Sequence, residues 1–339
     1  MRWVVVGGAG FIGGSLCRRL HDAGDDVVAV DIVEVDAPWP TRRADVLVDP
    51  VSLPPGRVVL AAGRSIPRPL RPWTLVSDNA IATARLAPQL HDRDVTLLST
   101  VEVYGSAAGP LTEDTELRLP VSLPSLGAWV ERAATVAASP CPPHRAVGLC
   151  RELADLDPSG RWVYALSKLA QELLVRRAVP SERLTVLRLA NVVGQGQFRV
   201  LGRLVEAILD DRPCTVTDTN RSFVSVHEAA RVAHVATAAG TYNVSSGTVA
   251  LRDVAALVGE ELDRDPRVRL VLPPDPDSCG VVDAARVRDV VGPLEDVRHA
   301  LRAASRSIAD APGPMFRPPL RVVVPPRPEH PDLVADRVA

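Results

Sequence analysis

The sequence contains no run of basic residues, and its formal net charge is only -2 over 339 residues. A nucleic acid or an anionic membrane surface is therefore not expected as its main partner. It also contains no apolar run of the ~18 residues that a membrane-spanning helix needs. Residues 1–6 are too few for the apolar core of a secretory signal and run directly into glycines. These absences predict a cytoplasmic protein.

Paired cysteines are absent as well. The five cysteines, at positions 17, 141, 150, 214 and 279, follow no disulfide or metal-site spacing, which favours free thiols in a reducing compartment. Cys141, His144 and Cys150 could supply three zinc ligands, whereas a structural zinc site takes four, usually in close pairs. We therefore predict no metal site.

Lysine is the scarcest charged residue, because only one of the 39 basic residues, Lys168, is not arginine. Tyr164 precedes it by four residues, a spacing that places both side chains on one face of a helix. A compact ammonium beside a phenol favours the phenolate, so we expect the pKa of Tyr164 to fall toward neutrality. The phenol could then exchange protons with a substrate hydroxyl. The alternative is a solvated tyrosine and lysine on a helix surface.

The chain is long enough for about two domains, and its N-terminal segment has the pattern of a dinucleotide site. Residues 3–6 read as a short buried strand, which is followed by the glycine turn 7–13, GGAGFIG, and then by apolar residues at helical spacing. Such glycines permit close approach of the backbone, and the helix N-terminus would face a pyrophosphate. The predicted cofactor contacts of this turn are Gly7, Gly10, Phe11, Ile12 and Gly13.

The next two predicted strands continue this cofactor site. The strand 27–30 ends at Asp31, whose carboxylate would accept from both ribose hydroxyls and repel a 2'-phosphate, which favours NAD over NADP. The alternative for Asp31 is a solvated acid in a turn. Residues 44–47 could run past the adenine, and the strand 57–63 ends in small residues where a cofactor could approach the backbone. This adds Asp45, Val46, Ala61, Ala62 and Gly63 to the predicted cofactor contacts.

Hydroxyl residues follow the predicted strand 95–98. Asp78 and Asn79 open a predicted helix that extends to residue 90, and the strand after it delivers Ser99 and Thr100. In an open parallel sheet the carboxyl ends of the strands face the ligand crevice, so these two hydroxyls could hold a substrate oxygen. They could instead only cap the local backbone.

Together, the glycine turn, Asp31, STVEVYG at 99–105, YALSK at 164–168, LRLANVVG at 187–194 and RSFVSV at 221–226 resemble the extended short-chain dehydrogenase/reductase family. This family contains NAD-dependent nucleotide-sugar epimerases and dehydratases, and the resemblance covers about residues 3–300. It implies an α/β fold, namely a Rossmann-type doubly wound parallel sheet with a smaller C-terminal α/β substrate domain. It also implies NAD as the cofactor, a nucleotide sugar as the substrate, and a homodimer.

The resemblance also implies domain bounds and residue roles. The NAD-binding domain would span 1–190, with 222–240 returning to it, the substrate-binding domain 191–311, and a proline-rich tail 312–339. Tyr164 would be the catalytic acid/base, Lys168 would lower its pKa and hold the nicotinamide ribose, and Thr100 would share the substrate proton. Asn79 and Ser99 would also contact the cofactor, and Glu102, Asn191 and Arg221 would contact the substrate.

Four departures from the family pattern bear on function. Val6 replaces the usual threonine, a change of small consequence, and Val101–Glu102 replaces the Asp–Glu pair of the 4,6-dehydratases. An insertion at about 120–160, with predicted helices 126–138 and 146–156, could be a lid, a partner surface or a surface decoration. Residues 272–275, LPPD, replace an Arg-Pro-Gly-Asp stretch whose arginine contacts the diphosphate in relatives.

Beyond the tyrosine, the pattern predicts strands at 184–189, 223–226, 241–244 and 268–272, and helices at 198–210 and 250–262. A 4-epimerase that works through a transient 4-keto sugar is the most economical function, since Thr100, Tyr164 and Lys168 suffice for it. A dehydratase or decarboxylase that uses Glu102, or a simple dehydrogenase, is the alternative within the family. A non-catalytic NAD-binding scaffold is less expected, because the tyrosine and the lysine are both present.

Overall fold

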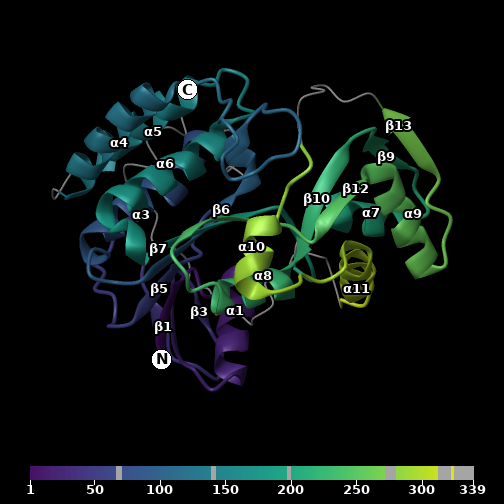
Figure 1. The fold of residues 1–339 in the computed structure, drawn as a ribbon, viewed down its shortest axis with the longest axis horizontal. Helices are drawn as coiled ribbons and strands as arrows, with labels where there is room; N and C mark the ends of the chain where they lie inside the picture. Colours follow the sequence, from purple (N-terminus) through teal and green to yellow (C-terminus); the bar gives the residue numbers. More distant parts are fainter. Residues whose placement is uncertain (66–70, 139–142, 197–199, 272–279, 312–321, 324–339) are drawn as a thin grey trace.

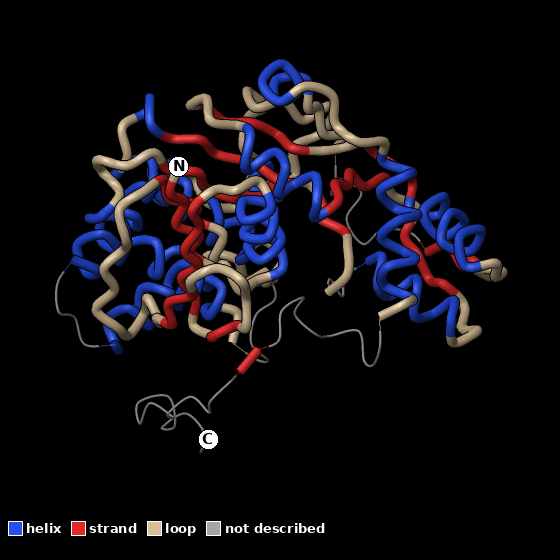
Figure 2. Tube along the Cα trace, turned by 90° about the horizontal axis from the view of Figure 1, so that it is seen from below, coloured by secondary structure: helices blue, strands red, loops and turns tan. Residues whose placement is uncertain are grey.

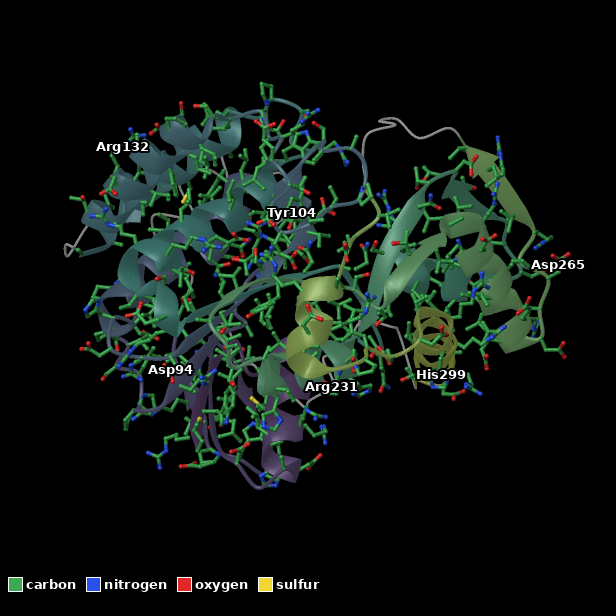
Figure 3. All side chains as sticks on the ribbon, in the orientation of Figure 1. Asp94, Tyr104, Arg132, Arg231, Asp265 and His299 are labelled. Carbon is green, nitrogen blue, oxygen red and sulfur yellow. The ribbon has the colours of Figure 1, made fainter. Side chains whose placement is uncertain are left out.

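The computed structural model describes residues 1–65, 71–138, 143–196, 200–271, 280–311 and 322–323. They form two lobes (Figures 1 and 2), of which the larger contains the N-terminus and the smaller contains β9, β12 and β13. Tyr104 lies near the centre of the molecule, whereas Asp265 lies at the far edge of the smaller lobe (Figure 3). No helix of these described residues is long and apolar enough to cross a membrane.

A seven-stranded parallel sheet in the order β11-β7-β6-β5-β1-β2-β4 forms the centre of the larger lobe. Its strands β1, β2, β5, β6 and β7 are rich in Val and Leu, because helices cover both faces of a parallel sheet. The chain order reverses between β1 and β5, which places the ligand crevice at the carboxyl ends of those strands. The bounds are β1 Arg2–Val6, β2 Asp26–Asp31, β4 Thr41–Arg43, β5 Arg57–Leu60, β6 Val95–Thr100, β7 Leu184–Leu189 and β11 Gly240–Val244.

Helices pack on both faces of this sheet, as the doubly wound fold requires. Alternate strand residues enter opposite cores: Val5 packs with α1 and α8, while Val4 and Val6 pack with the end of α6 and with Leu86 and Leu90. One face carries α1 Phe11–Asp22, α8 Val226–Val235 and α10 Ala285–Val291, and the other carries α2 Trp73–Val76, α3 Ala82–Leu86 and α6 Val163–Ala178. The predicted Rossmann-type α/β fold is confirmed.

The helical segment before β6 differs from the prediction of a helix over 78–90. It begins at Trp73, continues as a π-helix η1 Ser77–Ile81 and α3, and ends in a 3-10 turn η2 Ala87–Gln89. Pro72 stands just before the first turn, where its fixed φ suits a helix start, and Pro88 lies in the tightened last turn. Asp78 and Asn79 therefore lie inside the helical segment and do not begin it.

The insertion forms two helices, α4 Leu123–Ala138 and α5 Pro143–Asp155, which extend the predicted helices toward the N-terminus. They pack against α2, α3 and α6 and share one apolar core with them. Leu126, Trp129 and Leu153 are fully buried in this core, and the Trp129 indole donates to the Leu149 carbonyl at 2.9 Å. The insertion is thus a packed layer over α6.

In the described residues, the smaller lobe has two small sheets and three helices around a core of its own. β8 Asn191–Val193, β10 Asn220–Ser225 and β12 Gly247–Ala250 form one sheet, β9 Cys214–Thr217 pairs with β13 Val268–Val271, and the helices are α7 Val200–Leu209, α9 Leu251–Leu262 and α11 Val297–Ala309. The predicted helix start at 198 and strand end at 272 lie outside the described residues.

The chain returns to the larger lobe at 226–244, and not at 222–240 as the sequence suggested. β10 belongs to the small sheet, because it pairs with β8 and β12, whereas α8 and β11 pack on and extend the main sheet. α10, which lies in the predicted substrate domain, packs on the main core through Val287 and Val291.

Some shorter features are also seen in the described residues. The 3-10 turn η3 Val101–Tyr104 directly follows β6, and the 3-10 turn η4 Ser181–Arg183 directly precedes β7. The predicted proline-rich tail contributes β14 Val322–Val323, which pairs antiparallel with β3 Glu34–Val35. Residues 312–321 and 324–339 lie outside the described part of the chain. Cys17, Cys150 and Cys214 are buried free thiols.

We expect Trp129→Ala to lower the free energy of unfolding by about 3–5 kcal/mol, because it removes a large, fully packed side chain and leaves a cavity. Leu123→Ala on the same helix is the control: Leu123 is 51% exposed, so its loss should change stability by less than about 0.5 kcal/mol. Urea unfolding of both variants measures the difference. Equal midpoints would show that α4 does not depend on this core.

Candidate active site

A cavity of about 580 Å³ lies at the carboxyl ends of the main-sheet strands. Its walls come from the turn after β1, the ends of β2, β5 and β6, the start of α6 and the segment after β7. Of the residues predicted from sequence, it is lined by Gly7, Gly10, Phe11, Ile12, Asp31, Asp45, Val46, Ala61, Ala62, Gly63, Ser99, Thr100, Glu102, Tyr164 and Asn191. The cavity lining does not include Gly13, Asn79, Lys168 or Arg221.

The glycine turn at one end of the cavity depends on two close approaches. Gly7 has φ +90°, and a Cβ there would lie 2.4 Å from the Ala62 nitrogen. A Cβ on Gly13 would lie 2.0 Å from the Gly7 carbonyl oxygen, so Gly13 permits α1 to pack on the turn and does not itself line the cavity. α1 begins after Gly10 without a side-chain cap, which leaves the N–H groups of its first turn available for an anion.

Asp31 stands where β2 ends and lines the same cavity. Its carboxylate accepts the Ala9 N–H at 3.0 Å and the Val33 N–H at 3.3 Å. Burial raises the pKa of this carboxyl above its ordinary value, and the backbone donors oppose that shift. The two N–H groups therefore hold the carboxylate against the turn and help it remain ionised.

These residues fit NAD. The cavity combines a helix N-terminus for the pyrophosphate, a carboxylate for the ribose hydroxyls, and a strand end made of Ala61, Ala62 and Gly63 where the backbone is accessible.

The other end of the cavity holds Thr100, at the end of β6. Thr100 is 7% exposed and extended, and its hydroxyl accepts the Glu102 N–H at 3.3 Å. It therefore caps the η3 turn and lines the cavity as well, and its contact with a substrate oxygen stays a prediction. Val101 and Glu102 line the cavity beside it. The neighbouring Ser99 hydroxyl instead donates to Glu172 at 2.6 Å, below the cavity floor.

Tyr164 and Lys168 come from the first turns of α6. Tyr164 is partly exposed and lines the cavity. Lys168 is only 5% exposed, and its ammonium donates to the Leu98 carbonyl at 2.7 Å and to the Gln171 side chain. The ammonium lies just beneath Gly63, where an added Cβ would be 3.9 Å from Nζ. Burial lowers the pKa of Lys168 to about 8, and the charge of Glu172 partly opposes this.

Asn79 lies outside the cavity lining and takes a supporting position, and its predicted contact with the cofactor stays a prediction. It is fully buried, and its side-chain amide bonds both backbone groups of Arg64, at 2.7 and 2.9 Å, and the Ser167 hydroxyl at 2.8 Å. Ser167 in turn donates to the Tyr164 carbonyl at 2.7 Å. Asn79 thereby joins the loop after β5 to the helix that carries Tyr164.

The residues predicted to bind substrate separate into two groups. Asn191 and Glu102 line the cavity, and the Asn191 amide donates to the Ser222 carbonyl at 3.0 Å. Arg221 is partly buried on β10, outside the cavity lining. Burial lowers the pKa of Arg221, the charge of Glu102 raises it, and that of Arg161 lowers it further. Arg221 and Glu102 are therefore close enough to interact. Residues 272–275, the LPPD stretch that replaces the Arg-Pro-Gly-Asp of relatives, lie outside the described residues.

Three buried residues below the cavity were missed in the sequence: Gln171, Glu172 and Arg188. Arg188 bonds Glu172 twice, at 3.1 and 2.8 Å, and its guanidinium lies 4.9 Å from the centre of the Tyr104 ring. Burial raises the pKa of Glu172, but the hydrogen bonds and charge of Arg188 reverse this, so the pKa lies below its ordinary value. An arginine inside the apolar strand LTVLRL was the available signal, because a buried charge needs a partner.

Fold and cavity together define a Rossmann-type dinucleotide-binding protein. The sequence profile of the NAD dependent epimerase/dehydratase family matches residues 3–123 and 149–246, which is more than half of the chain. The chain belongs to this family, as its resemblance to the extended short-chain dehydrogenases/reductases predicted. No curated protein matches it at a significant level.

Solved structures share the fold over nearly the whole chain. WbmH of Bordetella bronchiseptica in complex with NAD+ is 21% identical, with a TM-score of 0.68 over 91% of this chain and 98% of that one. UDP-glucuronic acid 4-epimerase from Bacillus cereus in complex with UDP-glucuronic acid and NAD is 18% identical, with a TM-score of 0.67 over 91% and 98%. MoeE5 in complex with UDP-glucuronic acid and NAD is 22% identical, with a TM-score of 0.66 over 90% and 98%. At these identities the likeness concerns the fold.

We expect Asp31→Ala to weaken NAD binding about tenfold or more, since a hydrogen bond to a charged group contributes about 1.5–3 kcal/mol. NADP binding should improve relative to NAD, because the repulsion of the 2'-phosphate is removed. Asp31→Asn, which keeps one acceptor oxygen and loses the charge, should weaken NAD binding less. Fluorescence titration with both cofactors measures these constants. Equal affinity of the native protein for NAD and NADP would contradict the role of Asp31.

Proposed function

We propose that the protein is an NAD-dependent nucleotide-sugar epimerase that inverts C4 of its substrate through a transient 4-keto sugar. The observation that carries this proposal is the composition of one cavity wall. Thr100 and Tyr164 supply two hydroxyls, whereas Val101 supplies an isopropyl group and Glu102 supplies a carboxyl. Membership of the NAD dependent epimerase/dehydratase family supports the reaction class.

The proposed roles follow from the proton and hydride balance of epimerisation. Tyr164 takes the proton of the C4 hydroxyl as general base while a hydride leaves C4 and the carbonyl forms. A bound NAD would supply the reversible hydride transfer. Thr100 holds the same oxygen by a hydrogen bond. After the keto sugar presents its other face, the hydride returns to C4 and Tyr164 returns the proton, so the product has the mass of the substrate.

Dehydration needs more groups than this cavity wall supplies. One group must take a proton from C5 and another must give a proton to the C6 hydroxyl as it leaves. Two adjacent carboxyls serve these roles in the 4,6-dehydratases of this family, and here Val101 replaces one of them. General acid assistance is worth ~100 to 10,000-fold, so the cavity favours epimerisation over dehydration.

A nucleotide sugar is the substrate class that we propose. The related structures hold UDP-glucuronic acid or UDP-glucose with NAD, which makes UDP-sugars the first candidates to test. Asn191 lies in the cavity wall, and Arg221 lies within electrostatic range of Glu102. A guanidinium suits a diphosphate, because it can bond two oxygens at once.

The decisive test is incubation of the purified protein with UDP-glucose, UDP-glucuronic acid and other nucleotide sugars in deuterated water, followed by mass spectrometry and NMR. We expect a product of unchanged mass, without deuterium at C5, and little effect of Glu102→Gln on its formation. A product lighter by one water and labelled at C5 would instead identify a dehydratase, and Glu102→Gln should then lower its rate ~100-fold or more.

We expect Tyr164→Phe to abolish turnover while NAD binding stays close to that of the native protein, because the phenol oxygen acts in proton transfer. Tyr242→Phe is the matched control: Tyr242 is buried away from the cavity and donates to the Ala239 carbonyl, so turnover should persist. Turnover assays and NAD titrations separate the two effects. Native-like activity of the Tyr164→Phe enzyme would exclude this residue as the acid/base.

A further inference from the structure

The ammonium of Lys168 belongs to a buried chain of hydrogen bonds that the mechanism above does not use. Lys168 donates to the Gln171 side-chain oxygen, and the Gln171 amide nitrogen donates to the Thr83 hydroxyl at 2.7 Å. Thr83 in turn donates to the Asn79 carbonyl at 2.8 Å. Gln171 is 1% exposed and Thr83 is 3% exposed. The chain thus links α6 to the helical segment 77–86.

This arrangement fixes which end of the Gln171 amide meets the lysine. The Thr83 hydroxyl has one proton, which it gives to the Asn79 carbonyl, so it must accept from its other neighbour. The NH2 group of Gln171 therefore points to Thr83, and its carbonyl oxygen points to Lys168. The amide cannot be reversed without leaving two donors facing each other in a buried site.

Both acceptors of the ammonium, the Leu98 carbonyl and the Gln171 amide, are neutral. Glu172, on the same helix, is engaged by Arg188 of β7 and by Ser99 of β6. Asp78, on the helical segment that faces α6, pairs with Arg64 at 2.7 Å. Within the described part of the chain, Lys168 forms no ion pair with a carboxylate.

We propose that Gln171 is a positioning residue for Lys168, whose ammonium it anchors beneath the cavity floor, between the Leu98 carbonyl and Thr83, without neutralising its charge. This inference rests on the proposed function, in which Tyr164 is the acid/base, and on the role that the family resemblance implies for Lys168, namely to lower the pKa of Tyr164. Because burial lowers the pKa of Lys168 to about 8, the ammonium is charged at lower pH and loses its charge as the pH rises through that value. Gln171 thereby helps to set the pKa of Lys168, and so the highest pH at which Lys168 is still charged and can support Tyr164.

Two substitutions of Gln171 should shift the pKa of Lys168 in opposite directions. In Gln171→Glu a carboxylate of the same shape faces the ammonium and favours its charged form, so the pKa of Lys168 should rise by about 1–3 units. In Gln171→Met the acceptor is removed at similar volume, so the pKa should fall. Gln89→Glu is the matched control, because Gln89 bonds Val51 and Leu53 far from Lys168, and it should leave the pKa unchanged.

Lys168 is the only lysine of the chain, which makes this measurement direct. Full-length protein labelled with 13C-lysine gives a single side-chain Cε resonance, and its shift between pH 6 and 11 reports the pKa without any substrate. We expect a rise in Gln171→Glu, a fall in Gln171→Met and no change in Gln89→Glu. An unchanged pKa in Gln171→Glu would overturn the proposal, even where Gln171→Met fails to fold.

A second readout connects the titration to catalysis. The alkaline limb of the pH–rate profile should move with the measured pKa of Lys168, upward in Gln171→Glu, which a purely structural role of Gln171 would not produce. A limb that stays in place while the pKa moves would overturn the catalytic part of the proposal. The NMR titration remains interpretable if no nucleotide sugar is turned over, so failure of the proposed function and failure of the Gln171 proposal are distinguishable.

Discussion

A buried ion pair between Glu172 and Arg188 supports the floor of the cavity. Arg188 on β7 stands in register with Ser99 on β6, and Glu172 on α6 bonds both side chains. Removal of one member of such a pair leaves an uncompensated buried charge, at a cost of about 3–5 kcal/mol. Lys168 and Tyr164 precede Glu172 on α6 by one and two helical turns. The Glu172–Arg188 ion pair therefore fixes how far Lys168 and Tyr164 lie from the sheet.

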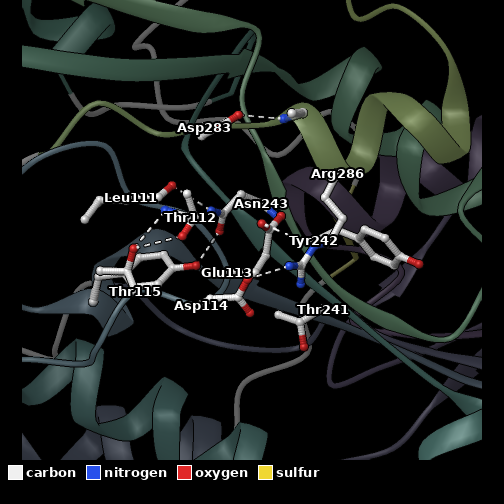
Figure 4. A network of polar contacts seen from close by, with 12 residues as sticks. Leu111, Thr112, Glu113, Asp114, Thr115, Thr241, Tyr242, Asn243, Asp283 and Arg286 are labelled. Carbon is white, nitrogen blue, oxygen red and sulfur yellow. Dashed lines mark hydrogen bonds and ion pairs between the residues drawn. The ribbon is translucent and has the colours of Figure 1, made fainter.

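A second polar network joins the segment after Thr100 to the rest of the larger lobe (Figure 4). The Asn243 amide of β11 accepts from the Tyr104 hydroxyl at 2.7 Å and donates to the Leu111 carbonyl at 2.9 Å, and its backbone N–H donates to Glu113 at 2.7 Å. Arg286 of α10 lies 3.7 Å from Glu113. Arg188 packs on the other side of Tyr104, so the two networks meet at this ring and hold the turn that carries Val101 and Glu102.

The two inserted helices add a third support. The family profile does not cover residues 124–148, and α4 and α5 cover the outer side of α6 with Leu126, Trp129 and Leu153. The helix that carries Tyr164 and Lys168 is therefore held by buried polar contacts on its sheet side and by apolar packing on its other side. Its first turn remains open to the cavity.

The sequence by itself determined the features that depend on local pattern. Apolar runs of strand length identified the sheet, and the glycine turn followed by Asp31 predicted which end of the cavity would bind NAD, because these motifs act through residues close together in the chain. Tertiary structure decided what depends on distant partners: Asn79 bonds the loop at Arg64, Gly13 packs on Gly7, and Lys168 meets Leu98 and Gln171 below the floor. Hydrogen-bond partners 15 or 70 residues away leave no periodic trace in a sequence. The same reason hid the return of the chain at 226–244, since only strand pairing assigned β10 to one sheet and β11 to the other.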